Sequence, residues 1–168
     1  MVLIRIVNPH VLTADGGIDW TQVPDGGFAH VAGEPVRAPY TPAVGEVIDR
    51  YGPPGRFVSP VPESGSYAYG ARALPYVEDA GQYHRYQVVG DMNDIPSAVR
   101  NHPDDEVHRG IVVKLEKYSV DLDGLRVDAG PIAPGFGHPG GGAQYLFPLS
   151  TQELEDLGLI REIGMEQE

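Results

Sequence analysis

Residues 47–60, VIDRYGPPGRFVSP, decide the fold because they contain two short apolar runs joined by a tight turn. The runs around VIDRYG and RFVSPV have the length and side-chain types of strands, and Pro53-Pro54-Gly55 between them favours a turn. Further along the chain, residues 84–89, HRYQVV, alternate as a half-buried strand does. The sequence therefore predicts strands joined by turns rather than a helical bundle.

The later part of the chain predicts a hairpin and a short helix. Residues 110–120, GIVVKLEKYSV, have the apolar character of a strand, and Asp123-Gly124 is typical of a hairpin turn before residues 125–127, LRV. Ser150 with Glu153 three positions later forms a capping-box pattern, which predicts a helix over 151–157 that ends at Gly158. Residues 159–163, LIREI, are then expected to return as a strand or to form a tail.

The rest of the chain predicts extended or irregular segments. Residues 3–7, LIRIV, resemble a short strand, and the five prolines within 8–47 indicate an extended wrapping segment. Residues 91–109 are polar and contain two prolines, so a surface insertion with one short helical turn is expected there. No internal repeat or heptad pattern occurs.

Length and composition set the fold class. The chain has 168 residues, of which 22 are Gly and 16 are Pro. This size suits one ordinary domain, and the Gly and Pro content favours short elements joined by many turns. We expect one small α+β domain over residues 1–168, dominated by a twisted, mainly antiparallel β-sheet with short helices and long Pro/Gly-rich loops.

The charge and the missing residue types exclude several classes of function. The net charge of −12 gives little support to nucleic-acid binding or to contact with an anionic membrane. Ten of the 12 basic residues are nevertheless Arg, so a local anion site remains open. The chain has no Cys, and no stretch approaches the roughly 18 apolar residues of a membrane helix. No signal peptide is visible, which leaves a cytosolic protein or export by a route or parent polypeptide that the sequence does not show.

The densest unusual feature is the loop over residues 131–142, with three Pro and five Gly. Its prolines fix the path and its triple glycine lets a ligand touch the backbone, although a plain connecting loop has the same composition. It is not a Walker A loop, because no Lys-Ser or Lys-Thr follows the glycines. Gln144, just after the loop, could orient a water or a sugar hydroxyl, or could be an ordinary strand-edge amide.

Other side chains are candidates by type alone. Arg56 and Arg72 flank one strand–turn unit and could converge on a pyrophosphate, or could be surface charges. Phe57 fits a core position or a ring-stacking position, and His84 fits proton transfer or a strand edge. The six His residues are scattered without metal-ligand spacing, so no metal site is expected.

An acidic pair suggests a second chemistry. Glu153-Leu154-Glu155 is an ExE triplet of the kind that ADP-ribosyltransferases use. The triplet falls in the first turn of the predicted helix, where Glu is expected from capping alone.

Four motifs taken in order resemble the TNT domain, the family of the tuberculosis necrotizing toxin, whose members are NAD glycohydrolases. The motifs are DRYGPPGRFVSP (49–60), RALP (72–75), YHRYQVV (83–89) and GPIAPGFGHPGGGAQYLFP (130–148). Residues 20–28, WTQVPDGGF, also look like an upstream segment of the family, so the resemblance runs from about Trp20 to Ile163.

The resemblance implies a set of site residues. Gln144 would be the essential active-site glutamine, and Arg56 would contact the dinucleotide. Arg72 and His84 would be the other functional Arg and His, and Phe57 would stand beside the substrate. Gly142 and Tyr145, close to Gln144, would complete the substrate-binding residues.

The resemblance also implies a toxin that hydrolyses NAD or NADP to nicotinamide and ADP-ribose or its phosphate. NAD would be its substrate and no further cofactor is expected; a cognate immunity protein would restrain it, and it would be secreted or delivered into a target cell. A protein ADP-ribosyltransferase and a non-catalytic interaction module remain the alternatives.

Residues 1–19 would form an N-terminal segment ahead of the matched motifs. Two departures from the family pattern stand out, and the first is residues 91–128, which look like an insertion that could cap the site or bind a partner. Gly135 stands in IAPGFG where the family usually has an aromatic residue.

Overall fold

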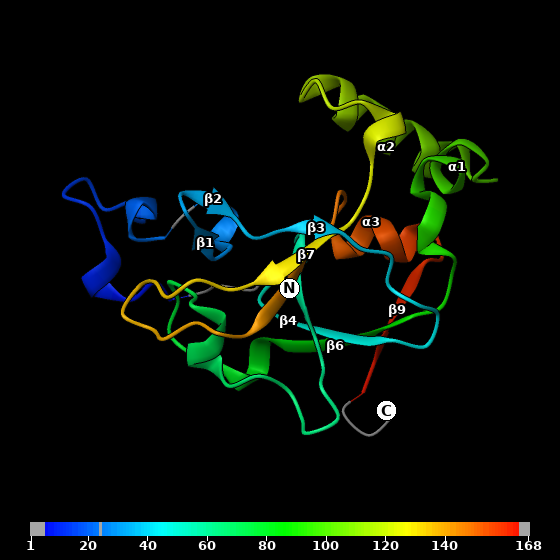
Figure 1. Cartoon of the computed structure of the whole chain (residues 1–168). Helices are drawn as coiled ribbons and strands as arrows, with labels where there is room; N and C mark the ends of the chain where they lie inside the picture. Colours follow the sequence, from blue (N-terminus) through cyan, green and yellow to red (C-terminus); the bar gives the residue numbers. More distant parts are fainter. Residues whose placement is uncertain (1–5, 24, 165–168) are drawn as a thin grey trace.

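A seven-stranded antiparallel sheet organises the molecule in the computed structural model, which describes residues 6–23 and 25–164 (Figure 1). The strand order is β3-β7-β8-β5-β4-β6-β9, and a separate two-stranded ribbon pairs β1 with β2. The strands are β1 (His30–Val31), β2 (Glu34–Pro35), β3 (Ala38–Pro39), β4 (Val47–Tyr51), β5 (Phe57–Pro60), β6 (Tyr83–Val88), β7 (Asp128–Pro131), β8 (Ala143–Leu146) and β9 (Ile160–Ile163). The helices are α1 (Ile95–Arg100), α2 (Asp105–Lys117) and α3 (Thr151–Asp156). The α+β class with a mainly antiparallel sheet is confirmed.

Residues 47–60 form the strand–turn–strand unit that their sequence predicts. β4 pairs with β5 through Ile48 opposite Pro60 and Asp49 opposite Ser59. β6 pairs along the other edge of β4, which confirms the strand expected at residues 84–89. The unit therefore stands near the centre of the sheet, and the side chains of β4 and β5 alternate between its two faces.

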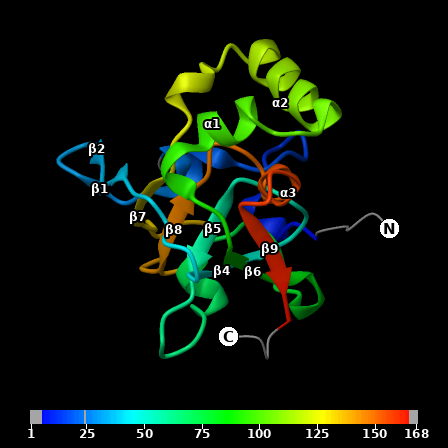
Figure 2. The ribbon, with the colours of Figure 1, turned by 90° about the vertical axis from the view of Figure 1, so that its right-hand side faces the viewer.

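One face of the sheet carries the core. Ile48, Val58, Tyr86 and Phe147 are buried on it and pack with apolar side chains from all three α-helices. In Figure 2, α1 and α2 lie together at one end of the molecule, with α3 between them and the sheet. The opposite face carries Asp49, Ser59 and Gln144, so alternation along the strands separates an apolar face from a polar one.

The hairpin expected from residues 110–120 is wrong, because residues 110–117 belong to helix α2 and residues 118–120 follow its end. Asp104 caps the helix by accepting hydrogen bonds from the backbone N–H groups of Glu106 and Val107. Ile111 and Leu115, four positions apart, are the buried residues of the helix. The β-branched residues suggested a strand, but the i, i+4 spacing and the cap fit a helix. The predicted hairpin turn is a short 3₁₀ turn, Leu122–Gly124, and residues 125–127 form no strand.

The C-terminal predictions hold. Ser150 Oγ accepts from the backbone N–H of Glu153, and the Glu153 carboxylate accepts from the backbone N–H of Ser150, as a capping box requires. Gly158 follows α3 at φ 75°, and β9 then pairs with β6. Of the strand predicted at residues 3–7, positions 3–5 lie outside the described residues, and Val7 forms an isolated bridge with Tyr76.

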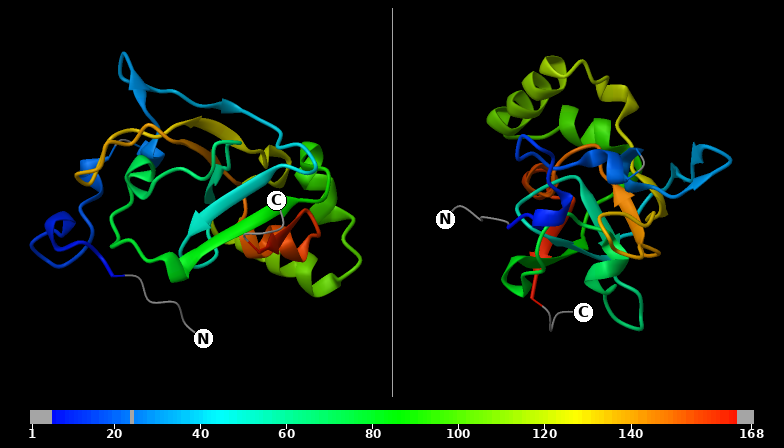
Figure 3. Two further views of the ribbon diagram at one scale, coloured as in Figure 1. Left: turned by 90° about the horizontal axis from the view of Figure 1, so that it is seen from below. Right: turned by 90° about the vertical axis from the view of Figure 1, so that its left-hand side faces the viewer.

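The N-terminal part wraps around the molecule in the extended form that its prolines predict. Short 3₁₀ turns at Pro9–Val11, Trp20–Gln22 and Asp25–Gly27 interrupt it. Residues 25–29 run beside the loop between β7 and β8, with Phe28 bridged to Ile132 and Ala29 N–H donating to the Pro131 carbonyl (Figure 3). These contacts bring residues 20–23 and 25–28, which we call the N-terminal wall, against the Gly/Pro loop.

Candidate functional site

The polar face of the sheet and the N-terminal wall enclose a cavity of about 360 Å³. We call it the Gln144 cavity. The residues that line it include Trp20, Gly26, Phe57, Arg72, Phe136 and Gln144. A recess of about 40 Å³ shares Phe57, Arg72 and Gln144 with the cavity and reaches Asp49 and Ser59. Three predicted site residues, Gln144, Phe57 and Arg72, therefore meet at one place.

Gln144 is held in a fixed orientation by the N-terminal wall. It lies on β8 opposite Gly130, is buried, and its Nε2 donates a 2.7 Å hydrogen bond to the carbonyl oxygen of Gly26. A carbonyl can only accept, so the NH₂ group must face Gly26 and Oε1 remains as an acceptor. No donor among the described residues reaches Oε1. The side chain thus offers the cavity an oriented neutral acceptor.

The backbone conformation of two glycines makes the hydrogen bond between Gln144 and the Gly26 carbonyl possible. Gly26 and Gly27 have φ values of 66° and 73°, in the left-handed region that suits glycine. The carbonyl of Gly27 accepts from the backbone N–H of Ala133, which ties the wall to the Gly/Pro loop. The two glycines thus allow the backbone path that turns the Gly26 carbonyl toward Gln144.

Arg72 is anchored by a buried carboxylate that the sequence prediction missed. Its two terminal nitrogens donate to the two carboxylate oxygens of Asp49 at 2.7 and 2.8 Å, and Asp49 is fully buried. The Tyr83 hydroxyl donates to the same carboxylate at 2.7 Å, and the Arg72 guanidinium lies 5.0 Å from the ring centre of Tyr51. The only sequence signal for Asp49 is that a charged residue stands inside a predicted apolar strand. A charge that is buried in such a strand needs an oppositely charged or hydrogen-bonding partner.

Burial and the ion pair act in opposite directions on Arg72. Burial alone would lower the pKa of Arg72, but the hydrogen bonds and charge of Asp49 outweigh it and the pKa is raised. Arg72 is therefore cationic, and Asp49 offsets its charge at the cavity floor. The pair contributes orientation to the cavity more than net charge.

Aromatic side chains form the rim of the Gln144 cavity. Phe57 is 39% exposed and Trp20 is 58% exposed, both unusually open for large apolar residues. Trp20 packs edge-on against the buried Phe136, with ring centres 5.8 Å apart. Trp20 belongs to the motif at residues 20–28, but the only sequence signal for this residue itself is that it is the single Trp in the chain.

Gly135 is explained by the N-terminal wall. A Cβ at position 135 would lie 2.2 Å from Val23 Cγ1 and 3.1 Å from the Gln22 carbonyl oxygen. Val23 thus fills the space beside residue 135, and no larger residue fits there without movement of the wall. The sequence departure at Gly135 and the path of residues 20–23 belong together.

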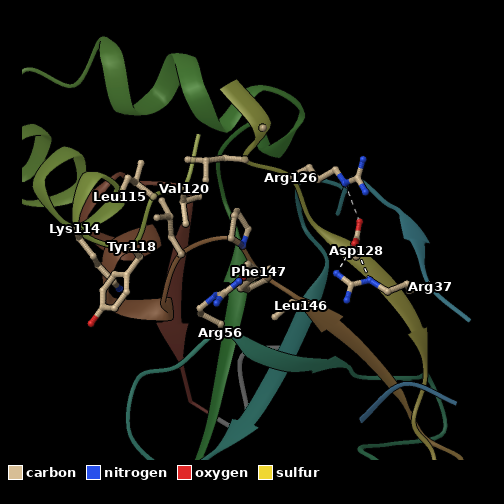
Figure 4. A pocket seen from close by; sticks show the side chains of 14 residues that line it. Arg37, Arg56, Lys114, Leu115, Tyr118, Val120, Arg126, Asp128, Leu146 and Phe147 are labelled. Atoms are coloured by element: carbon tan, nitrogen blue, oxygen red, sulfur yellow. Dashed lines mark hydrogen bonds and ion pairs between the residues drawn. The ribbon is translucent and has the colours of Figure 1, made fainter. Parts of the chain in front are cut away.

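Arg56 does not line the Gln144 cavity. Its Nε donates to the Phe147 carbonyl at 2.9 Å, and it lines a second cavity of about 550 Å³ next to α2 (Figure 4). Arg56 lies just before β5, and Phe57 is the first residue of that strand, so these two sequence neighbours line different cavities.

His84, Tyr145 and Gly142 also lie apart from the cavity lining. His84 Nδ1 is 2.7 Å from the Glu162 carboxylate across β6 and β9. Tyr145 faces the core, packs against Tyr40 with ring centres 4.9 Å apart, and its pKa is raised, first by burial. Gly142 exchanges backbone hydrogen bonds with Ala71 and Ile132. The roles predicted for these three residues and for Arg56 stay predictions.

Glu153 and Glu155, the acidic residues of the ADP-ribosyltransferase alternative, lie outside the Gln144 cavity. Glu153 serves the capping box and accepts from Lys114 Nζ at 2.8 Å, and neither Glu153 nor Glu155 lines the Gln144 cavity. Within the described residues there is no group of three side chains suited to hold a metal ion. Over the same residues, no helix is long and apolar enough to cross a membrane.

Comparison with known proteins gives a family match. The family model described as tuberculosis necrotizing toxin matches residues 42–163. Among solved structures, the chain is similar to that of tuberculosis necrotizing toxin complexed with its immunity factor IFT. The TM-score is 0.53 at 20% identity, over 89% of this chain and 65% of that one. The chain thus spans less than two thirds of the solved chain, and at this identity the likeness concerns the fold. No curated protein matches.

Proposed function

The chain belongs to the tuberculosis necrotizing toxin family, and from this premise we propose that it hydrolyses NAD or NADP. The products are nicotinamide and ADP-ribose, or its phosphate. The observation that carries the proposal is the oriented Gln144 acceptor in a cavity with aromatic walls.

The reaction asks for orientation more than for a strong acid or base. Nicotinamide leaves as a neutral molecule from a cationic pyridinium, and the ribose develops oxocarbenium character as the bond breaks. A site that holds the ribose, stabilises this developing charge and admits one water lowers the barrier. The electron pair of the broken C–N bond goes to nicotinamide, and water adds to the ribose carbon and loses a proton.

Gln144 suits this task because its acceptor is fixed before substrate arrives. With Nε2 held by Gly26, Oε1 can accept from a ribose hydroxyl or from the attacking water. A neutral acceptor near a developing cation is favourable, and a preorganised one costs no reorientation. We assign Gln144 as the catalytic residue.

The aromatic rim suits the rings of the substrate. Phe57 and Trp20 expose large apolar surface to the cavity, where a nicotinamide or adenine ring could stack. A cationic pyridinium ring also gains from an aromatic face. Arg72, with its charge offset by Asp49, has a fixed guanidinium that can orient a phosphate oxygen or a hydroxyl.

Arg56 and His84 remain proposed contributors on the strength of the resemblance alone. Neither lines the Gln144 cavity, so a direct contact with substrate requires a binding mode that extends beyond it. The same holds for Tyr145, which faces the core, and for Gly142, whose part is to position the loop beside Gln144.

We further propose that the protein acts as a delivered toxin restrained by an immunity protein. The related solved toxin is complexed with its immunity factor. An enzyme that depletes NAD would harm its producer, so an inhibitor bound near the Gln144 cavity is the expected safeguard.

The central test is NAD turnover by Gln144→Ala. We expect the wild-type chain to release nicotinamide and the variant to lose at least about 100-fold in kcat, the cost of removing one preorganised hydrogen-bonding group. Gln152→Ala is the matched control, because Gln152 is an exposed amide on α3 bonded only to Asp156 within the described chain. Full turnover by a folded Gln144→Ala protein would remove the central assignment.

Labelled NAD separates hydrolysis from transfer. Free labelled ADP-ribose supports the proposed hydrolase, whereas label retained on a protein acceptor would indicate an ADP-ribosyltransferase. Absence of both binding and turnover would favour an interaction module.

A further inference from the structure

The second cavity, next to α2, has a charge opposite to that of the whole protein. It has a volume of about 550 Å³, and its charged lining consists of Arg37, Arg56, Lys114, Arg126 and Asp128 (Figure 4). We call it the cationic cleft. One third of the 12 basic residues of the chain meet here, whereas only one of the 24 acidic residues lines the cleft. In a protein of net charge −12, this is a local site for an anion.

The four cations come from four separate segments of the chain. Arg56 precedes β5, Lys114 lies on α2, and Arg37 and Arg126 precede β3 and β7. Figure 4 shows Arg37 and Arg126 directed at Asp128 from either side, with Arg56 set apart from them near Phe147. The tertiary structure alone brings these charges together.

Internal ion pairs leave part of this charge uncompensated. Arg37 donates to Asp128 through Nε and one terminal nitrogen, and Arg126 donates to the same carboxylate through Nε. One carboxylate thus serves two guanidinium groups. Lys114 is paired with Glu153 beside the cleft, so four cations still face only two anions.

Arg56 and Arg126 have nitrogens available for a ligand. Arg56 uses Nε on the Phe147 carbonyl and has no carboxylate partner among the described residues. The side chain of Arg126 is 65% exposed, and only its Nε is bonded within the described part of the chain. Terminal guanidinium nitrogens are well suited to phosphate oxygens.

The rest of the cleft lining is apolar. Val120, 46% exposed, and Tyr118, 62% exposed at the edge, present the accessible apolar surface of the cleft, beside the buried Leu115, Leu125, Phe147 and Leu149. The cleft volume lies in the range of roughly 300–1,000 Å³ that small-molecule sites occupy. An inorganic ion would contact only the cationic side chains. An anion with an apolar or aromatic portion would contact both the cationic side chains and the apolar surface.

We infer that the cationic cleft is a second binding site, separate from the Gln144 cavity, for a small organic phosphate of the size of a nucleoside phosphate. Its phosphates contact Arg56 and Arg126, and its ring lies on the apolar surface with Tyr118 at the edge. The inference does not depend on the proposed hydrolase activity, because the two cavities have no lining residue in common.

The probe is ADP, with pyrophosphate and adenosine as its two halves, measured by calorimetry and by amide NMR shifts. We expect ADP to bind more tightly than either half, and to shift residues 114–126 and 146–149. Arg126→Gln should weaken ADP binding about tenfold, the loss of one charge-assisted contact. Arg109→Gln, the same change at an exposed position of α2 outside the cleft, should leave affinity within about twofold.

A second variant tests the contact with the ring of the ligand without changing any charge in the cleft. Tyr118→Ala should weaken binding of ADP but not of pyrophosphate, and Val113→Ala, at an exposed position of α2, should change neither. Three results would overturn the inference: shifts confined to residues around Gln144, equal effects of Arg126→Gln and Arg109→Gln, or no binding of ADP. Tight binding of pyrophosphate without any gain from the ring would also contradict the assigned ligand class.

Discussion

The Gln144 cavity and the cationic cleft have no lining residue in common, and they use arginine in opposite ways. In the Gln144 cavity, Arg72 is enclosed, its side chain 5% exposed and matched by a fully buried Asp49. In the cleft, Arg126 is 65% exposed and shares Asp128 with Arg37. Burial with a carboxylate partner fixes the guanidinium in one orientation. An exposed guanidinium can instead bind an anion from solution. The same ion-pair chemistry therefore supports orientation in one place and recognition in the other.

The largest expected effect is on the free energy of unfolding when an arginine is removed from the Arg72–Asp49 pair or from the Arg126–Asp128 pair. Arg72→Ala leaves the buried Asp49 without its partner, so we expect a loss of about 3–5 kcal/mol in the free energy of unfolding. Arg126→Ala, at a solvent-exposed pair, should cost no more than about 1 kcal/mol. Urea unfolding of the two variants measures both values. Similar losses would show that burial does not distinguish the two arginines.

A second test disturbs the N-terminal wall at Gly135. Gly135→Ala places a methyl group against Val23, and overpacking of this kind costs about 1–3 kcal/mol. We also expect slower NAD turnover, because movement of the wall shifts the Gly26 carbonyl that holds Gln144. Thermal unfolding and nicotinamide release measure the two effects.

Two further variants control this test. Gly110→Ala, on α2 with no atom near its added Cβ, should be neutral or stabilising by up to about 1 kcal/mol. Adding Val23→Ala to Gly135→Ala should restore part of the loss, since it removes the colliding methyl group. If the double variant were no better than the single one, Val23 would not be the cause.

The smallest effect is the pH dependence of the pair between Glu153 and Lys114, beside the cleft. Burial favours the neutral form of Glu153, but hydrogen bonds from Lys114 and Ser150 outweigh it and lower the pKa below 4.5. A carboxyl whose pKa is lower in the folded state contributes stability above its unfolded pKa and loses it as the pH falls through the folded value. Glu153→Gln, which keeps the capping geometry, should therefore cost less than about 1 kcal/mol at pH 7, and the cost should be smaller at pH 3.

Urea unfolding at both pH values measures this difference. Glu116→Gln at an exposed position of α2 is the control, because it removes one carboxylate without touching the capping box. A cost for Glu153→Gln that stayed constant with pH would assign the effect to packing rather than to charge.

Local patterns predicted much of the sheet and the end of the chain. The turn at residues 53–55, the alternation in β6 and the capping box at Ser150 each depend on neighbours within a few residues, so the sequence contains their cause. The prediction failed at α2 because GIVVKLEK fits a strand by composition and a helix by spacing. Packing of Ile111 and Leu115 against the core decides for the helix.

The sequence by itself determined the family, the strand–turn–strand centre of the sheet and the choice of Gln144, Phe57 and Arg72 as residues to examine. Only the tertiary structure decided that Gly26 orients Gln144, that Asp49 neutralises Arg72 and that Arg56 belongs to a different cavity. The physical reason is range: caps, turns and alternation act between near neighbours, whereas Gly26 and Gln144 stand 118 positions apart in the chain. Contacts at that separation arise when the chain folds, and they determine which polar groups face a cavity and which face each other.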